Sequence, residues 1–209
     1  VIKSNKDIVL NKGVNANGIG QIEAKGNISA RFFENAIVYA EGDVNAGYIL
    51  SSRIMALGKV IVQGSRGTIH GGDVTGVMGI ETSNAGNASY APTNLRIGAT
   101  KKLRMDYANT IVQLKDIDSQ IEMYESALKK LTMVRDVKPE AFDNVSYTKI
   151  CQSKIIKSAE KAKCEQESKR LYDLIKESGK AVVKVDSKIF PGARIYIEAK
   201  VYEPVDTLV

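Results

Sequence analysis

The sequence predicts a mainly β protein, a parallel β-helix interrupted by an antiparallel coiled-coil hairpin. Two observations carry this prediction: an internal repeat in the first hundred residues, and a heptad pattern that begins directly after them. Glycine marks the boundary, because 15 of the 17 glycines lie in residues 1–100 and none lies in 101–178. Glycine disfavours helix and marks tight turns. We therefore expect a β-helix over 1–100, the hairpin over 101–178, and return strands over 179–209 that complete the β-helix.

The repeat places a β-branched residue, an alanine, a glycine and a second β-branched residue at fixed intervals. Its copies are Ile22–Ile28, Val38–Val44 and Ile54–Val60, so the period is 16 residues. One coil cannot bury its inward residues alone, so we expect roughly five or six stacked coils. The expected columns of stacked side chains are Ile22, Val38 and Ile54, then Ile28, Val44 and Val60, and finally Ala24, Ala40 and Ala56.

The repeat becomes less regular after Val62, where glycines crowd together. Short strands are expected at Thr68–Ile69 and Asp73–Val74. The stretch Thr82–Thr93 is polar and poor in apolar residues, which favours a loop. Alternating apolar residues at 95–97 predict a last strand before the helical segment.

From Lys101 the apolar residues step by three and four, which is typical of a coiled-coil helix of about 35 residues. Pro139 cannot continue this helix, so a turn is expected there. A second helix is predicted from about Phe142 to Ser178, with Gly179 as its C-terminal cap. The predicted apolar seam of the first helix is Leu103, Tyr107, Leu114, Ile117, Ile121, Tyr124, Leu128 and Leu131. The apolar residues of the second helix are Ile150, Ile155, Ile156, Ala159, Ala162, Leu171, Leu174 and Ile175.

Residues 179–209 return to strand, because Val183, Val185 and Ile189 alternate with polar residues. The stretch Phe190–Ala193 holds proline and glycine at the two central positions of a tight turn. So short a β segment is unstable alone, and we expect it to close the last coil of the β-helix.

The glycine-rich repeats and the order of the parts together resemble a known family. The stretches Lys25–Asn45 and Ala46–Val74, the strand at Ala91–Gly98, the helical insertion and the return at Ile189–Gly192 resemble the β-helical region of the flagellar assembly protein A (FapA) family. The resemblance implies a right-handed β-helix in a bacterial cytoplasmic protein with a role around flagellar assembly or its spatial control. It implies no catalytic residues. The region also resembles the division inhibitor MinC, which works by protein–protein contact.

Composition excludes several classes of function. The net charge of +6 is spread along the chain, so no basic block predicts nucleic-acid binding. No apolar run is long enough to span a membrane. Cys151 and Cys164 lie too far apart on one helix for a disulfide, and free thiols suit a reducing cytoplasm. The chain begins at Val1 rather than methionine, so we expect it to be part of a longer protein with a further N-terminal domain.

Three groups of residues could carry chemistry. His70 is the only histidine, and β-helix acyltransferases use histidine as a general base, but their coils follow a hexapeptide repeat. Gly64–Gly67 and Gly71–Gly72 could form an anion-binding nest, although tight turns explain these glycines equally well. Asp43 and Asp73 each follow a glycine, as in calcium-binding β-rolls.

The position of Asp43 in the other repeat copies is held by Asn27 and Lys59, which argues against a ladder of metal sites and favours a solvated turn. Neither cysteine has zinc-site spacing. We therefore expect no catalytic residues, no cofactor and no metal.

The turn of the hairpin is the candidate partner-binding site, because apolar residues gather there: Val134, Val137, Pro139, Phe142 and Val145. The alternative is that these residues only close the hairpin. The sequence thus favours a non-enzymatic scaffold or adaptor that binds protein partners and self-associates, without nucleic acid or an integral membrane segment. Two other functions stay open: a cytoskeletal protein that polymerises through its β-helix ends, and a β-helix transferase or lyase that uses His70.

Overall fold

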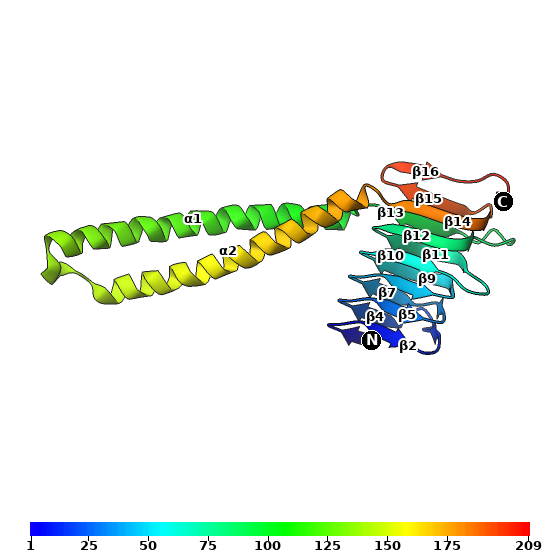
Figure 1. Ribbon diagram of the computed structural model, residues 1–209, viewed down its shortest axis with the longest axis horizontal. Helices are drawn as coiled ribbons and strands as arrows, with labels where there is room; N and C mark the ends of the chain where they lie inside the picture. Colours follow the sequence, from blue (N-terminus) through cyan, green and yellow to red (C-terminus); the bar gives the residue numbers. More distant parts are fainter. The chain divides into compact units, whose positions relative to one another are not determined.

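The computed structural model describes all 209 residues, which form two compact units (Figure 1). The solenoid unit contains residues Val1–Thr100 and Leu174–Val209, and the helical unit contains Lys101–Asp173. The predicted parallel β-solenoid with an inserted helical hairpin is confirmed. Its right-handed winding stays a prediction.

Three ladders of parallel strands run along the solenoid, and long strands pass from one ladder to the next. Ladder 1 contains β1 (Ile2–Ser4), β4 (Gln21–Ala24), β7 (Ile37–Ala40), β9 (Tyr48–Ala56), β11 (Thr68–Gly76), β13 (Thr93–Ile97) and β15 (Ala193–Ile197). Ladder 2 contains β2 (Ile8–Leu10), β5 (Ile28–Ala30), β8 (Val44–Ala46), β10 (Lys59–Val62), β12 (Gly79–Ala85) and β14 (Val182–Ile189). Ladder 3 contains β3 (Val14–Asn15), β6 (Phe33–Glu34) and the remaining parts of β9, β11, β12 and β14.

The predicted columns form the core of the first two ladders. Ile22 lies beside Val38, which lies beside Ile54, and all three are almost fully buried. The same ladder continues through Val74, Leu95 and Ile195. The second column runs through Ile28, Val44, Val60 and Ile80, and the three alanines pair in register in ladder 1. Residues 1–100 contribute six strands to ladder 1, which agrees with the five or six coils expected there.

The sequence prediction missed the third ladder. Its buried column consists of Phe33, Ile49, Ile69 and Ala85, flanked by the half-buried Val14 and Ile189. These side chains differ in size and kind, so they do not repeat as recognisable letters. Phe33 is fully buried and is among the largest side chains in the core.

The predicted loop over Thr82–Thr93 is too long. β12 runs to Ala85 and β13 begins at Thr93, so only residues 86–92 lie outside strands. The sequence suggested a loop because these residues are polar. However, Thr82 can be buried in a strand because its hydroxyl donates a hydrogen bond to the Gly67 carbonyl oxygen at 2.9 Å. Similarly, the two short strands expected near residues 68–74 are parts of the single strand β11.

The helical unit contains α1 (Lys101–Val137), a 3₁₀ turn η1 (Pro139–Ala141), and the greater part of α2 (Asn144–Ser178). The predicted seam of α1 is half-buried or, at Leu103, buried. The seam of α2 differs from the prediction, because Ile155 and Ile156 are largely exposed.

Three lysine side chains, rather than these two isoleucines, are half-buried in the seam of α2. Lys154, Lys157 and Lys161 are half-buried, and they use their aliphatic stems as apolar surface while the ammonium groups reach acids. The ammonium of Lys154 lies 2.9 Å from Glu125, and that of Lys161 lies 2.6 Å from Asp118. Hydrogen bonding to Asp118, followed by the charge of that carboxylate, raises the pKa of Lys161 above its usual value.

The C-terminal segment folds back on the last coil. The Ala193 N–H donates to the Phe190 carbonyl at 3.2 Å and Gly192 has φ of +88°, which confirms the predicted turn. β16 (Lys200–Tyr202) then pairs antiparallel with β15. Gly179 follows α2 as predicted, but it is not in the left-handed conformation, and its N–H donates to Lys176 in a 3₁₀ turn.

Candidate protein-binding surface

The hairpin turn is built by a proline and an aspartate. Pro139 has no N–H, so α1 ends at Val137 and the chain passes into the 3₁₀ turn. Asp143 then caps α2, because its carboxylate accepts the Ser146 N–H at 3.0 Å. Hydrogen bonding to Ser146 lowers the pKa of the Asp143 carboxyl. The turn therefore has a defined backbone path.

Four of the five residues predicted for this site are exposed. Val137 is 76% exposed, Val145 is 65% exposed and Val134 is 39% exposed, and Pro139 also faces solvent. Phe142 differs, because it is half-buried and its ring lies 5.5 Å from that of Tyr147. We call Val134, Val137, Pro139 and Val145 the tip surface.

A small cluster supports the tip surface from within. The Arg135 guanidinium lies 5.7 Å from the Phe142 ring, and Tyr147 contacts the same ring. Arg135 also lies 3.5 Å from the Asp136 carboxylate. Arg135 and Tyr147 were not predicted for this site, because only the cap at Asp143 brings the start of α2 back to Phe142. The result is an apolar surface with a rim of both charges.

His70 lies on ladder 3, where it pairs in register with Leu50, and it is half-buried. No group of three His, Cys, Asp or Glu side chains in the chain could hold a metal ion. The glycine amides beside His70 are already bonded: Gly71 donates to the Thr93 hydroxyl at 2.8 Å and Gly72 donates to the Pro92 carbonyl at 3.1 Å. These two amides are therefore not available to cradle an anion.

Asp43 is part of a hydrogen-bonded ladder rather than a simple solvated turn. The Asp43 carboxylate accepts the Lys59 N–H at 2.7 Å, and the Asn27 side chain accepts the Asp43 N–H at 2.8 Å. Asp7 does the same for the Asn27 N–H at 2.7 Å. Asp73, in contrast, accepts a hydrogen bond from the Asn94 side chain at 3.0 Å. Both acids are thus used for structure.

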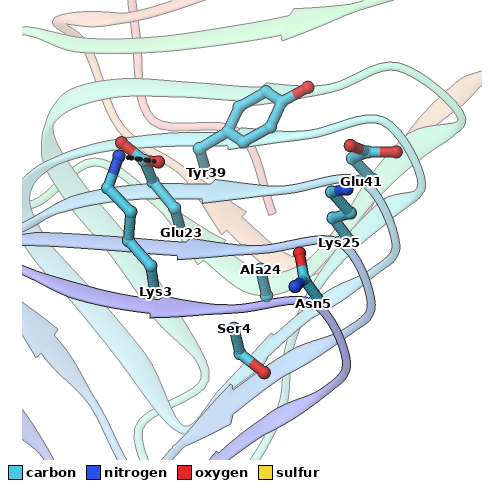
Figure 2. Close-up of a pocket in the computed structure, with 8 residues that line it drawn as sticks. All are labelled: Lys3, Ser4, Asn5, Glu23, Ala24, Lys25, Tyr39 and Glu41. Atoms are coloured by element: carbon cyan, nitrogen blue, oxygen red, sulfur yellow. Dashed lines mark ion pairs between the residues drawn. The ribbon is translucent and has the colours of Figure 1, made fainter.

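The solenoid surface also carries shallow grooves. One groove of about 270 Å³ lies over the first coils, and the Lys3 ammonium lies 2.7 Å from the Glu23 carboxylate in it. Figure 2 shows the residues that line this groove and marks the ion pair. Lys25 and Glu41 line the same groove, so its charges balance. A groove of about 650 Å³ lies beside Tyr48. Balanced charge gives the first groove no field that would concentrate a charged ligand.

The fold and this surface together define a class: a β-solenoid protein whose chain leaves between β13 and β14 to form a helical hairpin and then returns. The chain belongs to the flagellar assembly protein A family, whose β-solenoid domain matches residues 1–209. This family is bacterial, is related to flagellar assembly, and is not a known enzyme family. Neither the curated proteins nor the solved structures gave a significant match. None of the helices has the length and apolar character needed to cross a membrane.

Proposed function

We propose that this protein is a non-enzymatic scaffold or adaptor in flagellar assembly and that the tip surface binds a protein partner. The observation that carries the proposal is the exposure of Val134, Val137 and Val145 at an ordered turn. Exposed apolar side chains that gather at one place are typical of protein-binding sites. The family supports the cellular process.

The geometry of the turn supports binding rather than closure alone. The contacts that close the hairpin turn are made by Phe142, whose ring meets both Tyr147 and Arg135. The three valines are not needed for these contacts and leave apolar area in water. Burying this area on a partner contributes about 25 cal/mol per Å², and the mixed charges around it suit the polar rim of an interface.

The proposed location is the bacterial cytoplasm. Both cysteines are free thiols, which agrees with a reducing compartment, and the family is bacterial. Self-association of the chain is part of the same proposal, since coiled-coil arms often pair.

The test replaces the chromosomal gene of the source bacterium with a Val134→Ser, Val137→Ser and Val145→Ser variant. The matched control carries Met105→Ser, Val112→Ser and Met123→Ser, which are apolar positions of the same hairpin that are 56%, 66% and 61% exposed. Flagella are counted by electron microscopy, and partners are recovered by crosslinking in the cell. We expect the tip variant to lose one crosslinked protein and its flagella, while the control keeps both. Equal behaviour of the two variants would refute the proposal.

A His70→Ala strain separates this proposal from the enzymatic alternative. A scaffold does not need the imidazole, so we expect wild-type flagellation. Loss of flagella with an unchanged level of folded protein would instead favour catalysis by His70.

A further inference from the structure

The groove of about 650 Å³ beside Tyr48 carries positive charge that no acid of the protein neutralises. Three successive coils form it: Arg31 and Phe32 of the first, Gly47 and Tyr48 of the next, and the loop Gln63–Arg66 of the third. We call it the Tyr48 groove. No acidic residue lines it, and neither of its two arginines forms an ion pair. Its charge therefore faces solvent unpaired.

A stack of side chains holds one of the two guanidinium groups in place. The rings of Phe32 and Tyr48 stack with centres 4.9 Å apart, and the Arg66 guanidinium carbon lies 4.9 Å from the centre of the Tyr48 ring. Stacking uses the face of a guanidinium and leaves the N–H groups at its edge free to donate. Burial, followed by a hydrogen bond to Glu34, raises the pKa of Tyr48. The charges of Arg66 and Arg31 oppose this rise, so both guanidiniums lie near the same ring.

The carboxylate that acts on Tyr48 is already bonded elsewhere. Glu34 accepts the Tyr48 hydroxyl at 2.9 Å with one oxygen and the Asn15 side-chain amide at 3.1 Å with the other. In the groove of Figure 2, by contrast, the Lys3 ammonium pairs with the Glu23 carboxylate. Unpaired charges of one sign attract ligands of the opposite sign. The Tyr48 groove is therefore suited to an anion, whereas the groove of Figure 2 is not.

Backbone donors add to the two guanidiniums. The N–H groups of Gly64, Ser65 and Arg66 have no acceptor in the protein. Gly64 has φ of +141°, a conformation that only glycine adopts readily, and a Cβ there would lie 3.7 Å from the Gly47 Cα. Two glycines thus leave bare backbone at the groove, where an anion can come close to N–H groups.

We propose that the Tyr48 groove binds a phosphate group of a small ligand, held by Arg31 and Arg66 and by the N–H groups of the loop. Two guanidinium forks and three N–H groups provide about seven donors, whereas a carboxylate has roughly four acceptor sites. A phosphate group has more oxygens and a larger charge, so it matches this set better. The site is separate from the tip surface and does not depend on the proposed function.

The experiment titrates the full chain with sodium pyrophosphate at low, constant salt in a calorimeter. The test variant is Arg31→Gln with Arg66→Gln, and the matched control, Lys3→Gln with Lys25→Gln, removes the same charge from the groove of Figure 2. We expect each lost guanidinium to weaken binding about tenfold, and the control to stay within about twofold of the wild type. Absence of binding to the wild type, or equal weakening in both folded variants, would overturn the proposal.

The loop donors are tested by nuclear magnetic resonance. Pyrophosphate should shift the amide signals of Gly64, Ser65 and Arg66 in the wild type and leave them unchanged in the arginine variant. Arg66→Lys keeps the charge but loses the stacked fork, so it should bind more weakly than the wild type. Amide shifts that gather away from this loop would show that the phosphate binds elsewhere.

Two further probes define the source of the phosphate. Flotation with phosphatidylcholine vesicles, with and without phosphatidylglycerol, tests a lipid headgroup. Flotation that requires both phosphatidylglycerol and the two arginines would assign the phosphate to a lipid, and pyrophosphate binding without flotation would assign it to a soluble ligand. Hexaglutamate tests an acidic peptide. Binding of hexaglutamate as tight as that of pyrophosphate would refute the preference for phosphate.

Discussion

The Asp43 carboxylate of one coil accepts the backbone N–H of Lys59 in the next coil at 2.7 Å. Asn27 and Asp7 repeat this relationship one and two coils earlier. At this corner the backbone bonds between coils continue, since the Gly58 N–H donates to the Gly42 carbonyl at 3.0 Å, and the side-chain oxygen satisfies the N–H of the next residue. Asp7, Asn27 and Asp43 each supply this acceptor for the next coil. The series ends at Lys59, because a lysine side chain has no hydrogen-bond acceptor.

The Asp43 acceptor should be replaceable only by another acceptor. Asp43→Ala leaves the Lys59 N–H without its partner, so we expect the free energy of unfolding to fall by about 1–3 kcal/mol. Asp43→Asn supplies the same oxygen, as Asn27 does, and should cost clearly less. Urea unfolding followed by circular dichroism measures both. If the two variants are equally destabilised, the hydrogen bond is not what Asp43 contributes.

Gly58 lies against this acceptor. A Cβ at Gly58 would overlap the Asp43 carboxylate oxygen and approach the Gly42 backbone to 2.9 Å. Gly58→Ala should therefore destabilise the chain by about 1–3 kcal/mol. Gly179→Ala is the control, since its nearest neighbour would be the Lys176 carbonyl at 3.4 Å. Thermal unfolding of the two variants should separate them, and equal midpoints would contradict the steric argument.

Phe33 tests the third ladder. It is fully buried, whereas its neighbour Phe32 is half-buried and stacks on Tyr48 with ring centres 4.9 Å apart. Phe33→Ala creates a cavity and should cost about 3–5 kcal/mol. Phe32→Ala removes mainly surface stacking and should cost much less. Chemical unfolding gives both values, and a larger loss for Phe32→Ala would place the core elsewhere.

The seam of α2 can be mapped with two substitutions. Leu171 is 4% exposed, whereas Ile156 is 59% exposed. Leu171→Ala should destabilise the helical unit by about 2–5 kcal/mol, while Ile156→Ala should be close to neutral. The loss of helical circular dichroism on heating measures the difference in stability between the two variants. A reversed order would mean that the apolar pattern of the sequence, rather than the lysine-rich face, forms the seam.

The Asp143 cap gives the hairpin turn a dependence on pH. The pKa of this carboxyl is lower in the folded state than in the unfolded chain, mainly through Ser146. Its stabilising contribution is therefore present above the unfolded pKa, about 4, and is lost as pH falls through the folded pKa. Amide exchange at the start of α2 should accelerate in that acid range. Asp143→Asn, which caps without titrating, should remove this pH dependence.

The regular part of the fold could be predicted because chemically similar residues recur. Ile22, Val38 and Ile54 repeat at one period, so their column is visible in the sequence. The third ladder was not predicted, because Phe33, Ile49 and Ala85 differ in size and shape and so form no visible repeat in the sequence. Thr82 was predicted to lie in a loop because threonine is polar. The sequence does not show that its buried hydroxyl donates to a carbonyl within the solenoid.

The candidate site was predictable in outline only. A proline in a heptad pattern predicts a turn, and valines around it predict exposed apolar surface. Phe142 could not be separated from these valines by sequence, because its burial depends on Tyr147 and Arg135. The α2 seam was misread for a related reason: Lys154 and Lys161 pack through their stems, while hydropathy ranks them as surface residues.

The interruption between β13 and β14 has a kinetic consequence. Leu95 and Ile195 are neighbours in the sheet although about a hundred residues separate them, so joining the last coil carries a large loop-closure entropy. Helix pairing in the hairpin shortens the effective loop before these strands meet. The early coils can consequently fold during synthesis, while the final coil must wait for the helices to close.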